Sequence, residues 1–409
     1  MNTDAALIAE VRAWLRLHWE PSLTVREWWR LTTAAGWQFP SWPVGLGGAD
    51  LTTDEARLVH TEFAAFGALG PPFGVAQTHG APVIAAFGDA EQCVRLLPPV
   101  ARGEESWCQF FSEPGAGSDL AAVRTSAVLD GERWIVNGQK VWTSGATTAA
   151  RGILLARTDT SAAKHRGLSL FVIDLDQPGV EIRSIKQMNG SAEYFNESFF
   201  TDAVVSHRNL IGGEGNGWRL AVATLAFERA MNAKIPGLVT APPGPLGGML
   251  DRRAGDVLAA GEQTVPYFSN RAYVQTTRLI QVARERHATA IPDVRQTLAR
   301  LYALDHAIEW TDARAKAGAL QGNEPGVEAN LVKLAKSRLS RGAQHLGGRL
   351  LGAHAMLVGP DSFHCGAVAE MILTVPSFSI AGGTDEIQHN VIAERGLGLP
   401  REPASEGTR

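Results

Sequence analysis

Two short runs of the sequence combine glycine, hydroxyl and aromatic residues in a way that suits a flat ligand rich in hydrogen-bond acceptors. The first run, residues 109–119, contains Ser112, Gly115, Gly117 and Ser118. Glycine lets a backbone approach a ligand closely, hydroxyls add hydrogen bonds, and peptide N–H groups can face a ring edge or a phosphate. The alternative interpretation is an ordinary tight loop. If Gly-Ala-Gly were the only feature of the run, this alternative would be favoured.

The second run, residues 140–145, places Trp142 two residues before Ser144. Alternate side chains of a strand share one face, so a strand here predicts that the indole and the hydroxyl lie on the same side. Such a pair can stack on a heterocycle and bond its edge, although a Trp in a strand more often belongs to the core.

A carboxylate that suits acid–base chemistry follows at Glu228. Helical spacing places Glu228 over Leu225 and Ala221, with Met231 one turn further on, so its carboxylate is expected to emerge from an apolar stripe. Apolar surroundings disfavour the charged form of a carboxylate, which raises the pKa of such a group towards the range useful for a general base. The alternative is a salt bridge within a helical layer, since ion-pair networks also perturb carboxylates.

Three regions of different periodicity must position these residues. Residues 1–107 have helical spacing, with a capping-box pattern at Thr52 and Glu55. Residues 108–216 contain short β-rich runs between turn dipeptides, which predict an antiparallel sheet or small barrel. Residues 217–400 return to helical spacing around a Pro- and Gly-rich loop over 236–261. Together they predict an α+β fold with an N-terminal all-α domain, a central antiparallel β domain and a C-terminal α-helical domain.

Composition excludes several classes of function. The chain has 409 residues, a net charge of -4 and 45% hydrophobic residues, which fits a globular protein and argues against a nucleic-acid partner. It contains no apolar run long enough to span a membrane and no secretory pattern at its start, so we expect a cytoplasmic protein. Neither the histidines nor the three cysteines have ligand spacing, so we predict no metal site.

The chain resembles the acyl-CoA dehydrogenase flavoprotein family from roughly Trp42 to Pro400. The resemblance rests on the two runs described first and on further runs in the same order: Trp42-Pro43, Gly47-Gly48, Leu97-Pro98, Trp107-Cys108-Gln109, Phe195-Asn196-Glu197, Gly217-Trp218 and Gly382 to Gln388. It implies an acyl-CoA dehydrogenase-like fold, FAD as cofactor, and α,β-dehydrogenation of an acyl-CoA or acyl-carrier thioester.

The resemblance also implies which residues hold FAD. Trp142 would cover one face of the isoalloxazine ring, and Ser144 would hydrogen-bond near its N5, where the family often has Thr. Thr384 and Glu386 would meet another part of FAD, at a place where Thr384 can also cap a helix. The full set of expected cofactor-binding residues is Gln109, Phe111, Ser112, Gly117, Ser118, Trp142, Ser144, Thr384 and Glu386.

The catalytic base departs from the common family pattern. Many members carry Glu immediately before the Gly-Thr of the terminal motif, where this chain has Gly382, and glycine cannot accept a proton. The other location used in the family is a Glu-Arg pair on the first helix after the β domain, which corresponds to Glu228 and Arg229. The resemblance implies that Glu228 is the base and that Ser118, Arg229 and Gly382 bind substrate, with Gly382 offering its backbone N–H to the thioester carbonyl.

The motifs that reach a neighbour's FAD in family homotetramers match poorly here, and Gln344, Gly347 and Gly348 are approximate remnants. With Gly382 and Glu228, this pattern is most similar to catalytic subunits of actinobacterial heterotetrameric dehydrogenases that act on CoA thioesters of bulky side chains, including steroid ones. We therefore expect a homologous partner subunit, with a homotetramer as the alternative, and an electron-transfer flavoprotein or similar acceptor.

Two other functions stay open. One is a non-catalytic structural subunit of a heteromeric acyl-CoA dehydrogenase, which Gly382 and the poor cross-subunit motifs would fit. The other is a flavin oxidase or monooxygenase on the same fold, which differs in how oxygen reaches the flavin.

Overall fold

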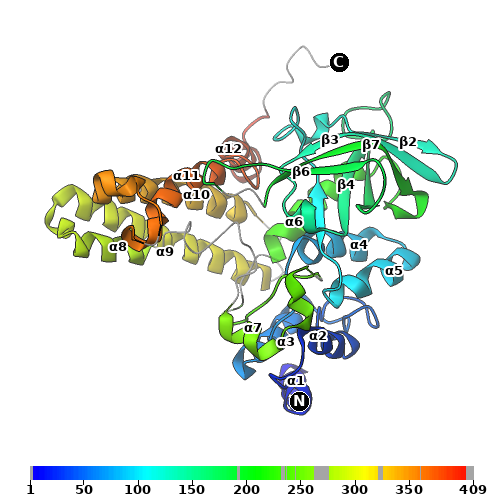
Figure 1. The fold of residues 1–409 in the computed structure, drawn as a ribbon, viewed down its shortest axis with the longest axis horizontal. Coiled ribbons are helices and arrows are strands. Elements are labelled where there is room, and N and C mark those ends of the chain that lie inside the picture. Colours follow the sequence, from blue (N-terminus) through cyan, green and yellow to red (C-terminus); the bar gives the residue numbers. More distant parts are fainter. Residues whose placement is uncertain are drawn as a thin grey trace. The chain divides into compact units, whose positions relative to one another are not determined.

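The computed structural model describes residues 3–190, 194–231, 235, 237–244, 246–261, 276–320, 326–359 and 361–401. The chain divides into two compact units, Met1–Tyr267 and Phe268–Arg409. Helices and a β-sheet form the first unit, and the second consists of helices (Figure 1). The domain boundaries expected at residues 107 and 216 stay a prediction.

The first unit begins with helices that pack around buried aromatic side chains. These helices are α1 (Thr3–His18), α2 (Val25–Ala34), α3 (Thr53–Phe66), α4 (Ala81–Phe87) and α5 (Ala90–Ala101). The capping box predicted at Thr52 and Glu55 is confirmed at the start of α3. On α2, the fully buried indoles of Trp28 and Trp29 donate to the carbonyls of Leu69 and Gly70, at 2.7 and 2.9 Å. These bonds satisfy the polar atoms of two large core residues.

The β domain is a single sheet of eight strands. Its strands are β1 (Trp107–Phe110), β2 (Ser126–Asp130), β3 (Arg133–Val141), β4 (Arg151–Arg157), β5 (Leu168–Asp174), β6 (Val180–Ser184), β7 (Asn196–Ser206) and β8 (Leu210–Ile211). The order is β6-β7-β3-β2-β4-β5-β8, with β1 paired to β4. Most pairs are antiparallel as predicted, but β1 and β2 both run parallel to β4. The β-rich runs of the sequence, 126–129, 134–136, 153–156, 168–174 and 180–185, fall on β2 to β6, so β1, β7 and β8 were not predicted.

The two faces of the sheet contribute to different cores, as strand alternation requires. On β4, Ile153 and Leu155 join a core shared with α4, α5 and the later helix α6 (Gly217–Met231). The intervening Leu154 and Ala156 face a second core, built from the strands themselves. Figure 1 shows α4, α5 and α6 beside the strands. The sheet therefore connects directly to the helix that carries Glu228.

The segment 236–261 was predicted to be a loop, and this is wrong in part. Helix α7 (Ala254–Ala260) occupies its end, and a 3₁₀ turn (Leu246–Asp251) precedes it. Ala254 and Val257 are buried in the core formed by the first helices of the chain. This packing is a long-range contact, so the Pro- and Gly-rich composition of the segment does not show it.

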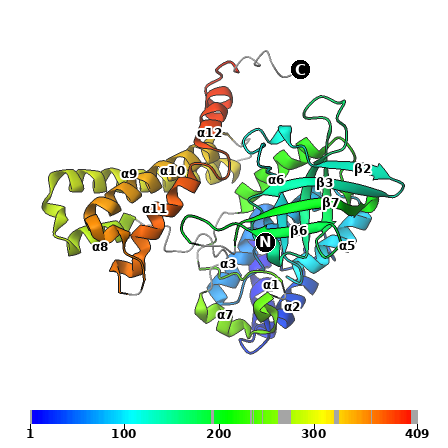
Figure 2. The same ribbon diagram turned by 45° about the horizontal axis from the view of Figure 1, so that its top comes forward.

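The second unit is a set of helices with its own core. The helices are α8 (Thr276–Glu285), α9 (Pro292–Leu320), α10 (Glu328–Leu351), α11 (Ala367–Phe378) and α12 (Asp385–Val391). Figure 2 shows α9 and α10 side by side along their length. Leu301 of α9, Leu339 and Leu346 of α10 and Met371 of α11 are buried in one cluster. None of the described helices is long and apolar enough to cross a membrane.

Candidate functional site

A buried ion pair fixes the first of the two ligand-binding runs. Lys140 of β3 is fully buried, and its Nζ lies 2.8 Å from the carboxylate of Glu113 and donates to the carbonyl of Phe111 at 2.9 Å. The Glu113 carboxylate also accepts the backbone N–H groups of Arg124 and Thr125, at 2.7 and 2.9 Å. Burial lowers the pKa of Lys140 to about 8, although Glu113 opposes this shift. The loop is thus tied to β3 and to the residues just before β2.

The same run contains a buried donor that suits a ligand. The side-chain Nε2 of Gln109, on β1, is buried and has no hydrogen-bond partner among the described residues. Buried polar atoms in native proteins usually have a partner, so a ligand acceptor is a natural one here. Phe111 is buried, Ser112 is partly buried, and Gly117 and Ser118 are exposed. The expected cofactor residues of this run therefore extend from the sheet to the surface.

The glycines of the loop are not required by packing. A side chain built on Gly115 or Gly117 meets no heavy atom within 4 Å among the described residues. Glu113 and Ala116 exchange two backbone hydrogen bonds of 3.0 Å, which confirms a tight turn at this point. A tight turn and an open backbone beyond it can coexist, so the structure is compatible with a ligand-binding run and with an ordinary tight loop.

The predicted strand placement of Trp142 and Ser144 is wrong. Strand β3 ends at Val141, and Trp142 has a φ of 62°, in the left-handed region that side chains rarely adopt. The indole is 57% exposed and meets Phe195 edge to face, with 5.9 Å between ring centroids. Ser144 is partly buried in the turn that follows. A strained backbone that presents a large aromatic face is typical of ligand sites.

Buried polar contacts hold this strained turn in place. Thr143 donates its hydroxyl to the carbonyl of Asn196 at 2.9 Å and lies 3.0 Å from the hydroxyl of Ser198. In return, the amide of Asn196 donates to the carbonyl of Thr143 at 2.9 Å. Because all three residues are fully buried, the conformation of Trp142 is set by the sheet beneath it.

Glu228 lies on α6, as predicted, but its surroundings are less apolar than expected. Leu220, Ala221 and Thr224 on the same helix are fully buried, and the Glu228 side chain is 30% exposed. Its Oε2 lies 3.3 Å from Nε2 of His79, whose side chain is only 12% exposed. The base candidate thus contacts a largely buried imidazole, a partner that the sequence did not reveal. The side chain of Arg229 lies outside the described part of the structure.

In the second unit, the terminal motif forms an ordered turn. Gly382 and Gly383 have φ values of 67° and 87°, and the side-chain amide of Gln388 donates to both of their carbonyls at 3.0 and 3.2 Å. The hydroxyl of Thr384 accepts the N–H of Ile387, which confirms that Thr384 caps α12. Glycine suits both positive φ values, so the residue type at these positions follows from the turn.

A buried carboxylate anchors this turn to α10. Asp385 accepts from Lys333 at 3.0 Å, from Ser337 at 2.8 Å and from Arg341. Burial alone would raise the pKa of Asp385, but the hydrogen bonds of Lys333 and Ser337 lower it. The neighbouring Glu386 is exposed, so it is available to a ligand as the resemblance requires.

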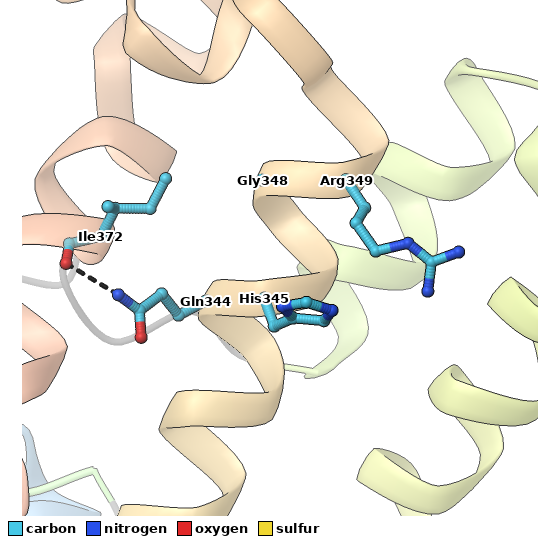
Figure 3. A pocket seen from close by; sticks show the side chains of 5 residues that line it. All are labelled: Gln344, His345, Gly348, Arg349 and Ile372. Carbon is cyan, nitrogen blue, oxygen red and sulfur yellow. Dashed lines mark hydrogen bonds between the residues drawn. The ribbon is translucent and has the colours of Figure 1, made fainter.

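A pocket of about 470 Å³ opens on α10 and α11 and is lined by Gln344, His345, Gly348, Arg349 and Ile372 (Figure 3). Gln344 donates to the carbonyl of Ile372 at 2.8 Å, as Figure 3 shows, and Arg349 pairs with Asp293 at 2.6 Å. The pocket thus contains two of the motif remnants, Gln344 and Gly348.

The structure brings the cofactor run, the Trp142 turn and Glu228 together in one unit, and it places Gly382, Thr384 and Glu386 in the other. That Glu228 and Gly382 serve the same substrate stays a prediction. Reasoning from sequence missed His79, the Lys140–Glu113 pair and Asp385, because each acts through a contact between segments far apart in the chain. Only the Asp-Glu pair after Thr384 gave a local signal, as acidic residues in the first turn of a helix.

Comparison with known proteins identifies the family. Models of acyl-CoA dehydrogenase domains match residues 4–104 (N-terminal domain), 108–204 (middle domain) and 267–397 (C-terminal domain). The chain is 36% identical over 384 residues to acyl-CoA dehydrogenase IpdE1 of Mycobacterium tuberculosis, which covers 92% of this chain and 88% of that protein.

Solved structures agree with this match. The ChsE4-ChsE5 complex from Mycobacterium tuberculosis is similar with a TM-score of 0.64 and 27% identity, over 98% of this chain and 99% of that chain. The structure described as the Tcur3481-Tcur3483 steroid ACAD has the same fold, with a TM-score of 0.69 and 24% identity over the same shares. The predicted fold class and the resemblance are confirmed: the chain belongs to the acyl-CoA dehydrogenase family of oxidoreductases.

Proposed function

We propose that this chain catalyses FAD-dependent α,β-dehydrogenation of an acyl-CoA or acyl-carrier thioester, with Glu228 as the base that removes the α-proton. The observation that carries the proposal is the Glu228 carboxylate on α6, partly exposed and in contact with His79. Gly382, at the other family location for a base, has no side chain to accept a proton. A structural subunit would have no need of a carboxylate at this position.

The reaction makes two demands on the chain. The α-hydrogen of a thioester is weakly acidic, so a base must be held in position while a donor stabilises the carbonyl oxygen as it gains negative charge. Glu228 would accept the proton on its carboxylate. Gly382 would donate its backbone N–H to the carbonyl oxygen, and the bonds from Gln388 to the turn support a fixed direction for that N–H.

The residues of the first unit fit FAD. The buried, unpartnered amide of Gln109 offers a donor to an acceptor-rich ring, and the exposed indole of Trp142 offers a face for stacking. Ser144 would hydrogen-bond the flavin edge, and Ser112 and Ser118 would line the approach of the thioester. When bound, FAD supplies the acceptor for the hydride that leaves the β-carbon. Thr384 and Glu386 would meet another part of the same cofactor.

A homologous partner subunit would complete this site. Relatives of this chain include a heteromeric complex, ChsE4-ChsE5. In this chain the amide of Gln344 is bonded within its own unit to the carbonyl of Ile372, and Arg349 is paired with Asp293. These internal bonds support a hetero-oligomer, in which the partner's motifs serve part of the FAD site. An electron-transfer flavoprotein or similar protein would then reoxidise the flavin.

The test is anaerobic mixing of the FAD-loaded protein with a panel of straight-chain, branched and steroid side-chain acyl-CoAs, with flavin bleaching as the signal. We expect Glu228→Gln to retain FAD and to lose flavin reduction by about 100-fold or more, the usual contribution of a general base. The matched control is Glu214→Gln, which neutralises an exposed carboxylate just before the same helix. Control rates should equal those of the wild type.

Two outcomes would contradict the proposal. Flavin reduction by Glu228→Gln at the wild-type rate would show that another group is the base. Wild-type protein that holds FAD but is reduced by none of the acyl-CoAs would favour a structural subunit or a different flavin reaction.

A further inference from the structure

The contact partner of Glu228 lies in an unusual piece of backbone. His79 belongs to a π-helical turn, Ala76–Gly80, that leads directly into α4. Such turns are rare and occur often at functional sites. The turn is firmly held, because Gln77 donates to the carbonyl of Val100 at 3.0 Å and a side chain at Gly80 would come within 2.7 Å of the Trp107 ring. The position of the imidazole is therefore set by the surrounding helices and by β1.

A hydrogen-bond chain defines which ring nitrogen of His79 carries a proton. The hydroxyl of Thr78 donates to the carbonyl of Gly74 at 2.8 Å, and its oxygen lies 2.7 Å from Nδ1 of His79. Because the hydroxyl hydrogen is donated to the carbonyl of Gly74, the Thr78 oxygen must accept the bond from His79, and Nδ1 therefore carries the proton. In a neutral ring, Nε2 is then an acceptor.

This tautomer decides what the contact with Glu228 can be. Nε2 of a neutral ring and an ionised carboxylate would both be acceptors, so they do not form a hydrogen bond. A bond at this position needs one proton between Nε2 and Oε2. A base must be ionised before it takes the α-proton, and in that state the shared proton sits on Nε2. The imidazolium then donates a charge-assisted hydrogen bond to Oε2.

We propose that His79 is a positioning residue for Glu228: its imidazole donates from Nε2 to Oε2, which fixes the plane of the carboxylate for proton removal. The inference rests on the proposed function, since it assigns a role relative to the base. His79 neither receives the α-proton nor touches the substrate. It acts through the direction of the carboxylate.

Three substitutions at one position separate this role from packing. His79→Gln places an amide donor near the position of Nε2. His79→Asn places its donor near the position of Nδ1, which does not reach Glu228. His79→Leu has no donor at either position. Each variant is loaded with FAD, with its partner subunit where binding requires it. It is then mixed anaerobically with the panel acyl-CoA that bleaches wild-type flavin fastest. His18→Leu is the control, because the described contacts of the His18 ring, a hydrogen bond to the carbonyl of Trp14 and a stack on its indole, both lie within α1.

We expect His79→Leu and His79→Asn to lower the limiting rate of flavin reduction about tenfold, while the half-saturating acyl-CoA concentration stays within about twofold of wild type. His79→Gln should stay within about threefold of the wild-type rate. Wild-type rates in His79→Leu, or equal rates for Gln and Asn, would overturn the inference. If His79→Leu does not fold, the comparison of His79→Gln with His79→Asn still tests the positioning role.

The Glu228→Gln variant keeps the two proposals apart. If it is inactive while the His79 variants reduce flavin normally, only the positioning role fails. If Glu228→Gln is active, the base assignment itself fails.

Discussion

Breaking the buried pair of Lys140 and Glu113 should destabilise the first unit strongly and unequally from its two sides. Removing one partner of a buried ion pair costs about 3–5 kcal/mol, because the other charge is left without compensation. Glu113→Gln leaves the fully buried Lys140 with neutral acceptors in place of the Glu113 charge, so we expect the upper part of this range. Lys140→Met leaves Glu113 two backbone N–H donors, at 2.7 and 2.9 Å, so its cost should be smaller, about 2 kcal/mol.

These energies convert into a shift of the thermal midpoint. The first unit has 267 residues, and an unfolding entropy of about 2.1 cal/mol/K per residue makes each kcal/mol worth about 2 °C. We therefore expect a loss of about 8 °C for Glu113→Gln and about 4 °C for Lys140→Met. The double variant should lose less than Glu113→Gln alone, since no buried charge is then left without a partner.

The assay is the unfolding midpoint of the FAD-loaded protein, followed by circular dichroism and by flavin release. The matched control is Asp130→Asn, which breaks a largely exposed ion pair with Arg133 on the same sheet and should shift the midpoint by about 1 °C or less. Single losses that simply add in the double variant would refute the reasoning, because they would show that the two charges do not depend on each other.

Three further outcomes follow from the structure. Trp142→Ala should raise the fluorescence of bound flavin and weaken FAD binding about fivefold, and an unchanged emission would contradict stacking. Burial lowers the pKa of His60 from 6.5 to about 4. The unfolded chain then binds more protons between these values, so stability should fall as the pH drops through this window. The loss should reach at most about 3 kcal/mol, and unfolding midpoints should show that His60→Gln removes it. Gly382→Glu, added to Glu228→Gln, should recover part of the flavin reduction on straight-chain acyl-CoA, despite a backbone strain of about 1–2 kcal/mol at its positive φ. No recovery would argue against the prediction that Glu228 and Gly382 serve the same substrate.

Local sequence signals predicted the parts of the fold that depend on neighbours in the chain. The capping pattern at Thr52 and Glu55 marked the start of α3, and the helical spacing of Ala221, Leu225 and Glu228 marked α6. The turn dipeptide Asp130-Gly131 marked the end of β2. In each case the hydrogen bonds or the buried face lie within a few residues, so the sequence contains the required information.

What the sequence could not show depends on contacts across the chain. The parallel pairing of β1 with β4 is a choice of partner that strand patterns do not encode. The left-handed φ of Trp142 is imposed by Thr143 and Asn196 from below, although strand propensity favours an extended residue there. Glu228 contacts a histidine from the π-helical turn, and no feature of the sequence near either residue indicates that the two are in contact.

The Lys140–Glu113 pair also affects how the protein binds its cofactor, because it orders the loop in advance. Its hydrogen bonds join the loop that follows β1, the residues just before β2 and the end of β3, so the loop cannot open unless these contacts break. The amide hydrogens of Arg124 and Thr125 should therefore exchange with solvent as slowly as those of the strands. A loop already ordered before FAD arrives loses little conformational entropy on binding, so more of the interaction energy appears as affinity. The apoprotein would then meet its cofactor with that part of the site already formed.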